Sequence, residues 1–146
     1  PSAPPPPAEV RIEASEAAAR QEAERRQEEA ERNRFVYEDI FFAPKSYRLD
    51  ERALELLRWK ADWLRRHPKV DVVVEGHTDK GGGRENNLYL GSKRAGAVMS
   101  YLLHQGIARE RLTAVSYGEE RPIAEGRGEE ERAKNRRVRL ILQGAP

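Results

Sequence analysis

The sequence has no cysteine among its 146 residues. A chain without cysteine forms no disulfide framework and offers no thiolate ligand to a metal, which is compatible with the cytoplasm or the periplasm. No apolar run approaches the roughly 20 residues of a membrane-spanning helix, and no signal-peptide pattern is found. Because the sequence begins with proline, we expect a mature or shortened form of a longer protein, with any signal peptide or lipid-bearing cysteine upstream.

Large apolar side chains are missing from residues 1–34, which contain no leucine, phenylalanine, tryptophan or tyrosine. Such a stretch cannot bury a core of its own. We predict a proline-rich tether at residues 1–9 and a charged helical spacer at 10–34, since its residues are strong helix formers with acid–base pairs four apart. The aromatic residues all follow, and we expect one compact domain at 35–143 and a short tail at 144–146.

An excess of either charge is also missing, because 27 basic and 25 acidic side chains leave a net charge of +2. Nucleic-acid binding needs basic residues clustered on one face. Here basic and acidic residues are interleaved along almost the whole chain. We therefore expect no nucleic-acid partner.

Apolar periodicity from residue 35 onward predicts alternating strands and helices. The expected strands lie at 36–42, 70–76, 112–117 and 137–142, and the expected helices run from an N-cap at Asp50 to Arg66, over 87–105 and over 129–134. Two helices must bury their apolar stripes on one sheet, and helical crossovers imply some parallel strand pairs. The order β-α-β-α-β-(α)-β therefore predicts an α/β two-layer sandwich with a mixed sheet.

The segment from Val72 to Val98 gathers the polar residues that could bind a ligand. A buried strand delivers Asp79 to a glycine-rich loop at its carboxyl end, where open α/β sheets bind ligands. The next helix presents its positive N-terminus, and Arg94 lies about two turns into it. Asp79 could accept from an ammonium while Arg94 grips a carboxylate in its planar fork. An internal ion pair between Asp79 and Arg94 fits the same spacing, and spacing leaves both interpretations open.

The sequence lacks the residue patterns of nucleotide-binding, catalytic and metal sites. Neither GxxxxGK[ST] nor GxGxxG follows the strand, so a nucleotide- or phosphate-binding module is only a remote alternative. No catalytic residue is expected, because the available serines lie outside a nucleophile-elbow motif. No cofactor and no metal are expected, since no two of the three histidines stand at metal-ligand spacing: His67, His77 and His104.

Residues 75–107 resemble the hallmark of the OmpA/Pal/MotB C-terminal domain family. They read EGHTDKGGGRENNLYLGSKRAGAVMSYLLHQGI. The family pattern is an acidic-Gly-His-Thr-Asp start, a glycine, an asparagine and Leu-Ser/Gly-x-x-Arg-Ala. Its places are held here by Thr78, Asp79, Gly82, Asn87, Leu90, Gly91, Arg94 and Ala95. Later blocks are similar too, and the resemblance covers 35–143: Ser46-Tyr47 with Leu49, Arg111-Leu112, Tyr117-Gly118-Glu119 with Pro122, and Asn135-Arg136-Arg137.

The resemblance implies non-covalent binding of peptidoglycan stem peptides, without enzyme activity. It implies that Asp79 and Arg94 hold the side chain of diaminopimelate, which ends in an ammonium and a carboxylate. Backbone amides of the loop around Gly82 would complete the carboxylate site. Thr78 and Asn87 would order the loop, and Arg136 would combine structural and ligand-side roles.

One wall of the expected groove departs from the family. Members usually carry an Asp-Phe-Asp-like stretch before Ser-Tyr, where this sequence has Ala43, Pro44 and Lys45. The departure bears on affinity or on the preferred stem peptide rather than on the fold.

The run Leu90-Gly91-Ser92-Lys93-Arg94 looks most like the Pal branch. That branch implies a periplasmic domain tethered to the outer membrane of a Gram-negative bacterium through an N-terminal anchor, with Tol-type periplasmic proteins as candidate partners. A MotB-like stator anchoring domain and an OmpA-type porin tail are the alternatives.

Overall fold

The computed structural model describes residues 3, 4 and 7–144. The chain divides into two compact units, Pro1–Arg34 and Phe35–Pro146. Parts of the predicted tether (1–2 and 5–6) and of the predicted tail (145–146) lie outside the described residues.

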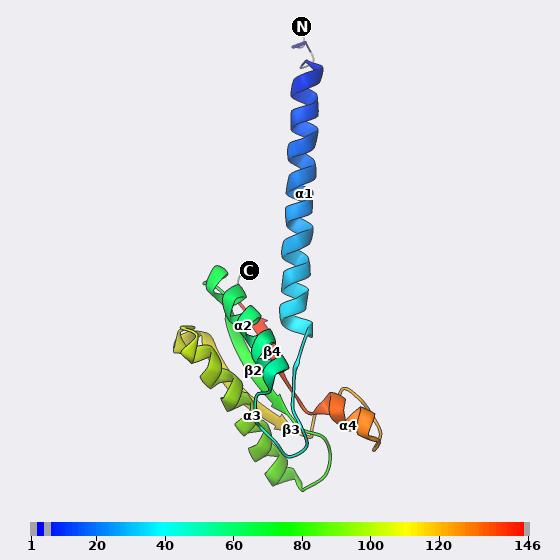
Figure 1. Ribbon diagram of the computed structural model, residues 1–146, viewed down its shortest axis with the longest axis vertical. Coiled ribbons are helices and arrows are strands. Elements are labelled where there is room, and N and C mark those ends of the chain that lie inside the picture. Colours follow the sequence, from blue (N-terminus) through cyan, green and yellow to red (C-terminus); the bar gives the residue numbers. More distant parts are fainter. Residues whose placement is uncertain (1–2, 5–6, 145–146) are drawn as a thin grey trace. The chain divides into compact units, whose positions relative to one another are not determined.

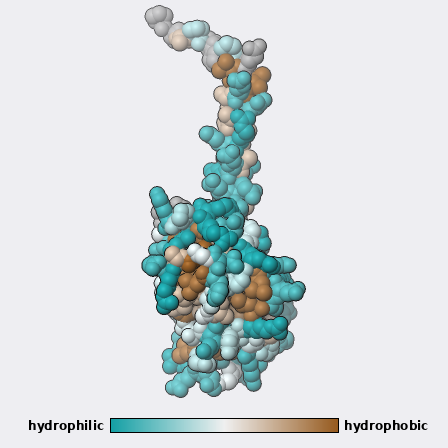
Figure 2. All heavy atoms as spheres, turned by 60° about the vertical axis from the view of Figure 1, so that its left-hand side comes forward, coloured by the Kyte–Doolittle hydropathy of each residue, from teal (hydrophilic) through white to brown (hydrophobic). Residues whose placement is uncertain are grey.

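One long helix, α1 (Ala8–Tyr37), forms nearly all of the described part of the first unit. Its surface is mostly hydrophilic, with apolar residues near its beginning (Figure 2). Arg25 pairs with Glu22 at 2.8 Å and with Glu29 at 3.0 Å, the kind of pair that stabilises a solvated helix. In the part of the chain that the structure describes, no helix combines the length and the apolar character needed to cross a membrane.

The first predicted strand, 36–42, is wrong at its beginning, because α1 continues through Val36 to Tyr37. Only β1 (Ile40–Phe41) pairs with the sheet. The helix is prolonged by tertiary contacts rather than by propensity. The Phe35 ring packs on Trp63 with centroids 4.6 Å apart, and the buried Lys60 ammonium donates to the carbonyls of Phe35 and Glu38, where the helix ends.

The second unit contains a four-stranded mixed sheet in the order β1-β4-β2-β3. Figure 1 labels the three long strands of this sheet, β4, β2 and β3. The central strand β2 (Asp71–His77) pairs parallel to β3 (Leu112–Gly118) and antiparallel to β4 (Arg137–Gln143), which in turn pairs antiparallel to β1. This arrangement confirms the predicted α/β sandwich with a mixed sheet.

Two helices bury their apolar stripes on the sheet, α2 (Glu51–Arg66) and α3 (Arg84–His104). Asp50 caps α2 as predicted, accepting from the backbone N–H of Ala53 at 2.8 Å. A 3₁₀ turn (Arg109–Arg111) follows α3, and the short helix α4 (Glu129–Asn135) precedes β4. The largest fully buried apolar side chains of the core are Trp63, Phe35, Ile40, Leu57, Leu64, Leu102 and Leu140.

Two glycines allow α3 to lie close to β2 and thereby position the loop between them. A Cβ on Gly76 would lie 1.8 Å from the carbonyl oxygen of Gly91, and one on Gly91 would lie 2.3 Å from Ser116 Oγ. Ser116 donates from that oxygen to the Leu88 carbonyl at 2.7 Å, which ties β3 to the same helix. The close approach sets Asn87 and Arg94, about one turn to either side of Gly91, against the end of β2.

The Gly76→Ala variant should therefore be destabilised by about 3 kcal/mol, the upper range for overpacking, since backbone must move to admit the methyl group. Gly96→Ala, on α3, is the control, because a Cβ at Gly96 would meet nothing within 4 Å. It should gain about 0.5–1 kcal/mol from helix propensity. Urea unfolding followed by circular dichroism measures both, and equal stabilities of the two variants would contradict the close contact.

Candidate functional site

The loop between β2 and α3 is held by two of the residues that the sequence singled out. Asn87, buried in the first turn of α3, donates to the Gly81 carbonyl at 2.7 Å and to Glu119 Oε1 at 3.1 Å. Thr78 donates its backbone N–H to the Gly118 carbonyl at 2.9 Å and its hydroxyl to the Asp79 carbonyl at 3.0 Å. Both residues thus order the loop, and their side chains make these bonds within the protein.

Glycine is required at the turn of this loop. Gly81, Gly82 and Gly83 have φ values of 129°, 84° and 94°, which side-chain-bearing residues rarely adopt. Gly83 is the N-cap of α3 and makes no side-chain capping bond. The helix therefore begins with N–H groups that no capping side chain occupies, next to a backbone that a ligand can approach.

Asp79 lies at the entrance of this loop, with 22% of its side chain exposed. Its Oδ2 accepts from Arg136 Nη1 at 3.2 Å. No described residue donates a hydrogen bond to the other oxygen, Oδ1. A carboxylate oxygen that is reachable from solvent and free of protein donors can accept from a ligand ammonium.

Arg136 joins three segments around Asp79. Its Nε donates to the Phe42 carbonyl at 2.9 Å, and its Nη2 pairs with Glu129 Oε1 at 2.7 Å. Only 7% of its side chain is exposed. It therefore links the end of β1, the loop after β2 and the start of α4, and orients the carboxylate of Asp79.

Arg94 is fully buried, and its contacts are with backbone rather than with Asp79. The guanidinium donates to the carbonyls of Ser46 at 2.7 Å, His77 at 3.0 Å and Ala43 at 3.2 Å. The pKa of Arg94 is lowered from 12.5 to about 10, mainly by burial, with the nearby Asp79 charge opposing the shift and the Arg136 charge adding to it. Arg94 stays charged at neutral pH, close enough to Asp79 to feel its field.

The internal ion pair considered between Asp79 and Arg94 does not form, because the carboxylate pairs with Arg136 instead. The planar fork of Arg94 is closed to solvent in this structure. Sequence spacing missed this arrangement, since the Ser46 and Ala43 acceptors lie 48 and 51 residues away from Arg94.

The departure from the family pattern falls on the turn that Arg94 holds. Ala43, Pro44 and Lys45 are exposed, and Lys45 adopts a positive φ of 59°. Two carbonyls of the turn, those of Ala43 and Ser46, accept from Arg94. The altered residues therefore belong to the exposed turn whose carbonyls accept from the Arg94 guanidinium.

His77, which spacing gave no ligand role, lies buried just before this loop. Its Nε2 is 3.3 Å from Glu75 Oε1, and its ring stacks on Tyr117 with centroids 5.6 Å apart. Burial, together with the positive charges of Arg137, Arg139 and Arg121, lowers the pKa of His77 from 6.5 to about 3. The imidazole is therefore neutral in the folded protein at neutral pH.

Stability should fall on acidification through this histidine. Since its pKa is near 6.5 unfolded and about 3 folded, the unfolded chain binds one more proton between these values. That difference removes stability by up to about 1.4 kcal/mol per pH unit as the pH falls. His77→Gln cannot take up the proton, so its free energy of unfolding should fall less steeply between pH 6 and pH 4. Parallel curves for parent and variant would show that His77 is not the group responsible.

A metal site is not indicated among the described residues, where no cluster of three or more His, Cys, Asp or Glu side chains could hold an ion. The site is instead one accessible carboxylate, a buried positive charge behind it and exposed loop amides. Such a set suits a dipolar organic group better than an ion.

Comparisons with known proteins identify relatives of this chain. The peptidoglycan-associated lipoproteins of Brucella melitensis and Agrobacterium fabrum are 38% and 39% identical over 110 residues, which is 75% of this chain. The match covers 66% and 62% of those relatives, so the chain spans slightly less than two thirds of their length.

Solved structures and a family match extend the likeness. The crystal structure of the peptidoglycan-associated lipoprotein from Burkholderia pseudomallei superposes with a TM-score of 0.70 at 38% identity, over 72% of this chain and 89% of that one. The C-terminal domain of Helicobacter pylori MotB also gives 0.70, at 27% identity, over 74% of this chain and 85% of that one. The OmpA family model matches residues 41–136, from β1 to the end of α4. By this match and these relatives, the chain belongs to the OmpA family.

Proposed function

We propose that residues 35–143 bind peptidoglycan non-covalently and tether an envelope structure to the cell wall. The chain is a binding domain rather than an enzyme, as its family and its peptidoglycan-associated relatives indicate. The observation that carries the proposal is the carboxylate of Asp79, fixed by Arg136 at a solvent-reachable loop with Oδ1 free of described donors.

The ligand group is the dipolar end of a diaminopimelate side chain. Its ammonium donates to Asp79 Oδ1, because that oxygen is oriented and reachable. Its carboxylate meets the positive side of the site, formed by the uncapped first turn of α3 and by the buried charge of Arg94. Exposed amides of the loop around Gly82 add donors at the same place.

For the ligand carboxylate to contact Arg94 directly, one of the three protein carbonyls that accept from Arg94 must move away. The Ala43 carbonyl is the natural candidate, because its 3.2 Å hydrogen bond is the longest of the three and its turn is exposed. A ligand carboxylate that replaced it would accept from Nη2 in a charge-assisted bond. The altered Ala43–Lys45 wall thereby bears on affinity.

The Pal-like role is favoured over a MotB-like stator anchor by sequence. At the same TM-score, identity is 38% to the Burkholderia lipoprotein and 27% to MotB. On this basis the domain is periplasmic, the spacer helix leads toward an outer-membrane anchor, and Tol-type proteins are candidate partners.

Co-sedimentation with purified diaminopimelate-type sacculi tests the function. The chain should sediment with intact sacculi, should be released by free stem peptide, and should stay in the supernatant with glycan stripped of stem peptides by an amidase. Failure to sediment, or equal binding to stripped glycan, would contradict stem-peptide recognition.

A further inference from the structure

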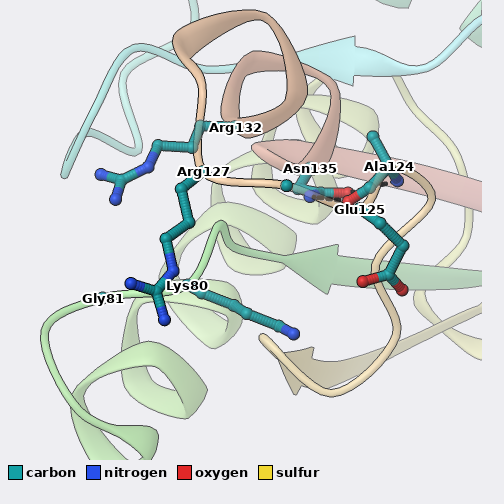
Figure 3. A pocket seen from close by; sticks show the side chains of 8 residues that line it. Lys80, Gly81, Ala124, Glu125, Arg127, Arg132 and Asn135 are labelled. Atoms are coloured by element: carbon teal, nitrogen blue, oxygen red, sulfur yellow. Dashed lines mark hydrogen bonds between the residues drawn. The ribbon is translucent and has the colours of Figure 1, made fainter.

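A pocket of about 270 Å³ adjoins the proposed ligand site and is not used by it (Figure 3). One wall is Lys80 and Gly81, which directly follow Asp79. The other wall is formed by residues 124–127 of the loop before α4, together with Arg132 and Asn135. The pocket therefore lies between the two loops that end β2 and β3.

Hydrogen bonds hold both walls of this pocket. The buried Asn135 accepts from the backbone N–H of Ile123 at 2.8 Å and of Ala124 at 3.2 Å, and donates to the Ala124 carbonyl at 2.9 Å. On the facing wall, Asn87 donates to the Gly81 carbonyl at 2.7 Å. The ion pair between Arg136, next to Asn135, and the Asp79 carboxylate connects the two walls.

The lining of the pocket is positively charged. It contains the cations of Lys80, Arg127 and Arg132 against one carboxylate, Glu125. Figure 3 shows Arg127 reaching across toward the Lys80–Gly81 backbone, with Arg132 on the same side and Glu125 opposite. Within the described part of the chain, none of the three cations has a hydrogen-bonding or ion-pair partner. The guanidinium forks are therefore available to an anion.

We propose that this pocket binds a second carboxylate of the stem peptide. It is the same peptide whose ammonium group donates a hydrogen bond to Asp79. The proposal rests on the function proposed above and extends it. Because Lys80 follows Asp79 directly, a peptide seated on Asp79 passes the mouth of the pocket. A stem peptide carries carboxylates besides that of diaminopimelate, at its glutamate and at its C-terminal residue. Arginine forks suit a planar carboxylate, and the surplus positive charge selects an anion over the neutral amide.

The test combines changes in the protein with changes in the ligand. The triple variant Lys80→Gln, Arg127→Gln, Arg132→Gln removes the three cations, and Lys134→Gln is the control, since Lys134 lies on α4 outside the pocket. Calorimetry compares each protein with the stem peptide, with the peptide amidated at its glutamate, and with the peptide amidated at its C-terminus. A thermal melt confirms that every variant is folded.

The triple variant should bind the unmodified peptide roughly fivefold more weakly than the parent, as expected for partly solvated charge pairs. One of the two amidations should weaken peptide binding by the parent to the same degree but leave binding by the triple variant unchanged. That amidation identifies the carboxylate that the pocket binds. The control should match the parent. If neither amidation affects the parent, or the triple variant binds like the parent, the pocket proposal is wrong while binding through Asp79 stands. No binding by the parent would overturn both.

Discussion

Replacing Arg94 by alanine is expected to lower the free energy of unfolding by on the order of 3 kcal/mol or more. The guanidinium is fully buried and donates to three carbonyls from two segments, the turn after β1 and the end of β2. A buried acceptor left without a donor costs about 1–3 kcal/mol. The exposed turn can be partly rehydrated, but the His77 carbonyl lies in the interior, so the loss is large beside a typical stability of about 5–15 kcal/mol.

The free energy of unfolding of Arg94→Lys should lie between those of the parent and Arg94→Ala, because a single ammonium cannot reproduce the planar fork that reaches three acceptors. Lys93→Ala is the control, as the neighbouring side chain is exposed and its removal should change stability by less than about 0.5 kcal/mol. Urea unfolding measures all three. An Arg94→Ala protein as stable as the Lys93→Ala protein would show that the buried hydrogen bonds contribute little.

This expectation changes how binding data on Arg94 should be interpreted. A weaker-binding Arg94→Ala variant could owe its loss to a loosened Ala43–Ser46 turn rather than to a missing ligand contact. Asp79, with part of its carboxylate exposed, is therefore the better residue for testing ligand recognition.

Asp79→Asn is expected to weaken binding to diaminopimelate-type sacculi by roughly 30-fold. The substitution keeps the shape of the side chain but removes the charge that accepts the ligand ammonium. Truncating one partner of a hydrogen-bonded charge pair costs about 2 kcal/mol or more, which corresponds to that factor in affinity.

Glu129→Gln provides the matched control for Asp79→Asn. Both substitutions remove one of the two carboxylates that pair with Arg136, but Glu129 is 71% exposed and lies outside the proposed ammonium site. The affinity of Glu129→Gln for the sacculi should stay within about twofold of that of the parent. If folded Asp79→Asn binds as well as Glu129→Gln, the assignment of Asp79 is wrong.

The sequence predicted the architecture because its cues are local. Alternating and helical apolar patterns located three of the four strands and the two long domain helices, and Asp50 marked the start of α2. Such local cues did not predict that β1 pairs with the sheet over two residues only. Aromatic and β-branched residues in 36–42 favour a strand, but Phe35 packing on Trp63 and Lys60 at the helix end keep Val36 and Tyr37 helical.

The site was predicted only as far as residues lie near one another in sequence. Thr78 and Asn87 order the glycine loop, and both act within it or next to it. The pairing of Asp79 with Arg136 joins residues 57 positions apart, and two of the acceptors of Arg94 are similarly distant. No local spacing encodes such partners, so the guanidinium that faces Asp79 could not be identified from the pattern.

Recognition of the dipolar end of diaminopimelate is tested most directly by calorimetry with two stem peptides that differ only at the third residue. The diaminopimelate peptide offers both an ammonium and a carboxylate, whereas the lysine peptide offers the ammonium alone. The chain should bind the first peptide at least about tenfold more tightly, because the lysine peptide leaves the positive side of the site without its anion. Equal affinities, or no binding of either peptide, would contradict the account.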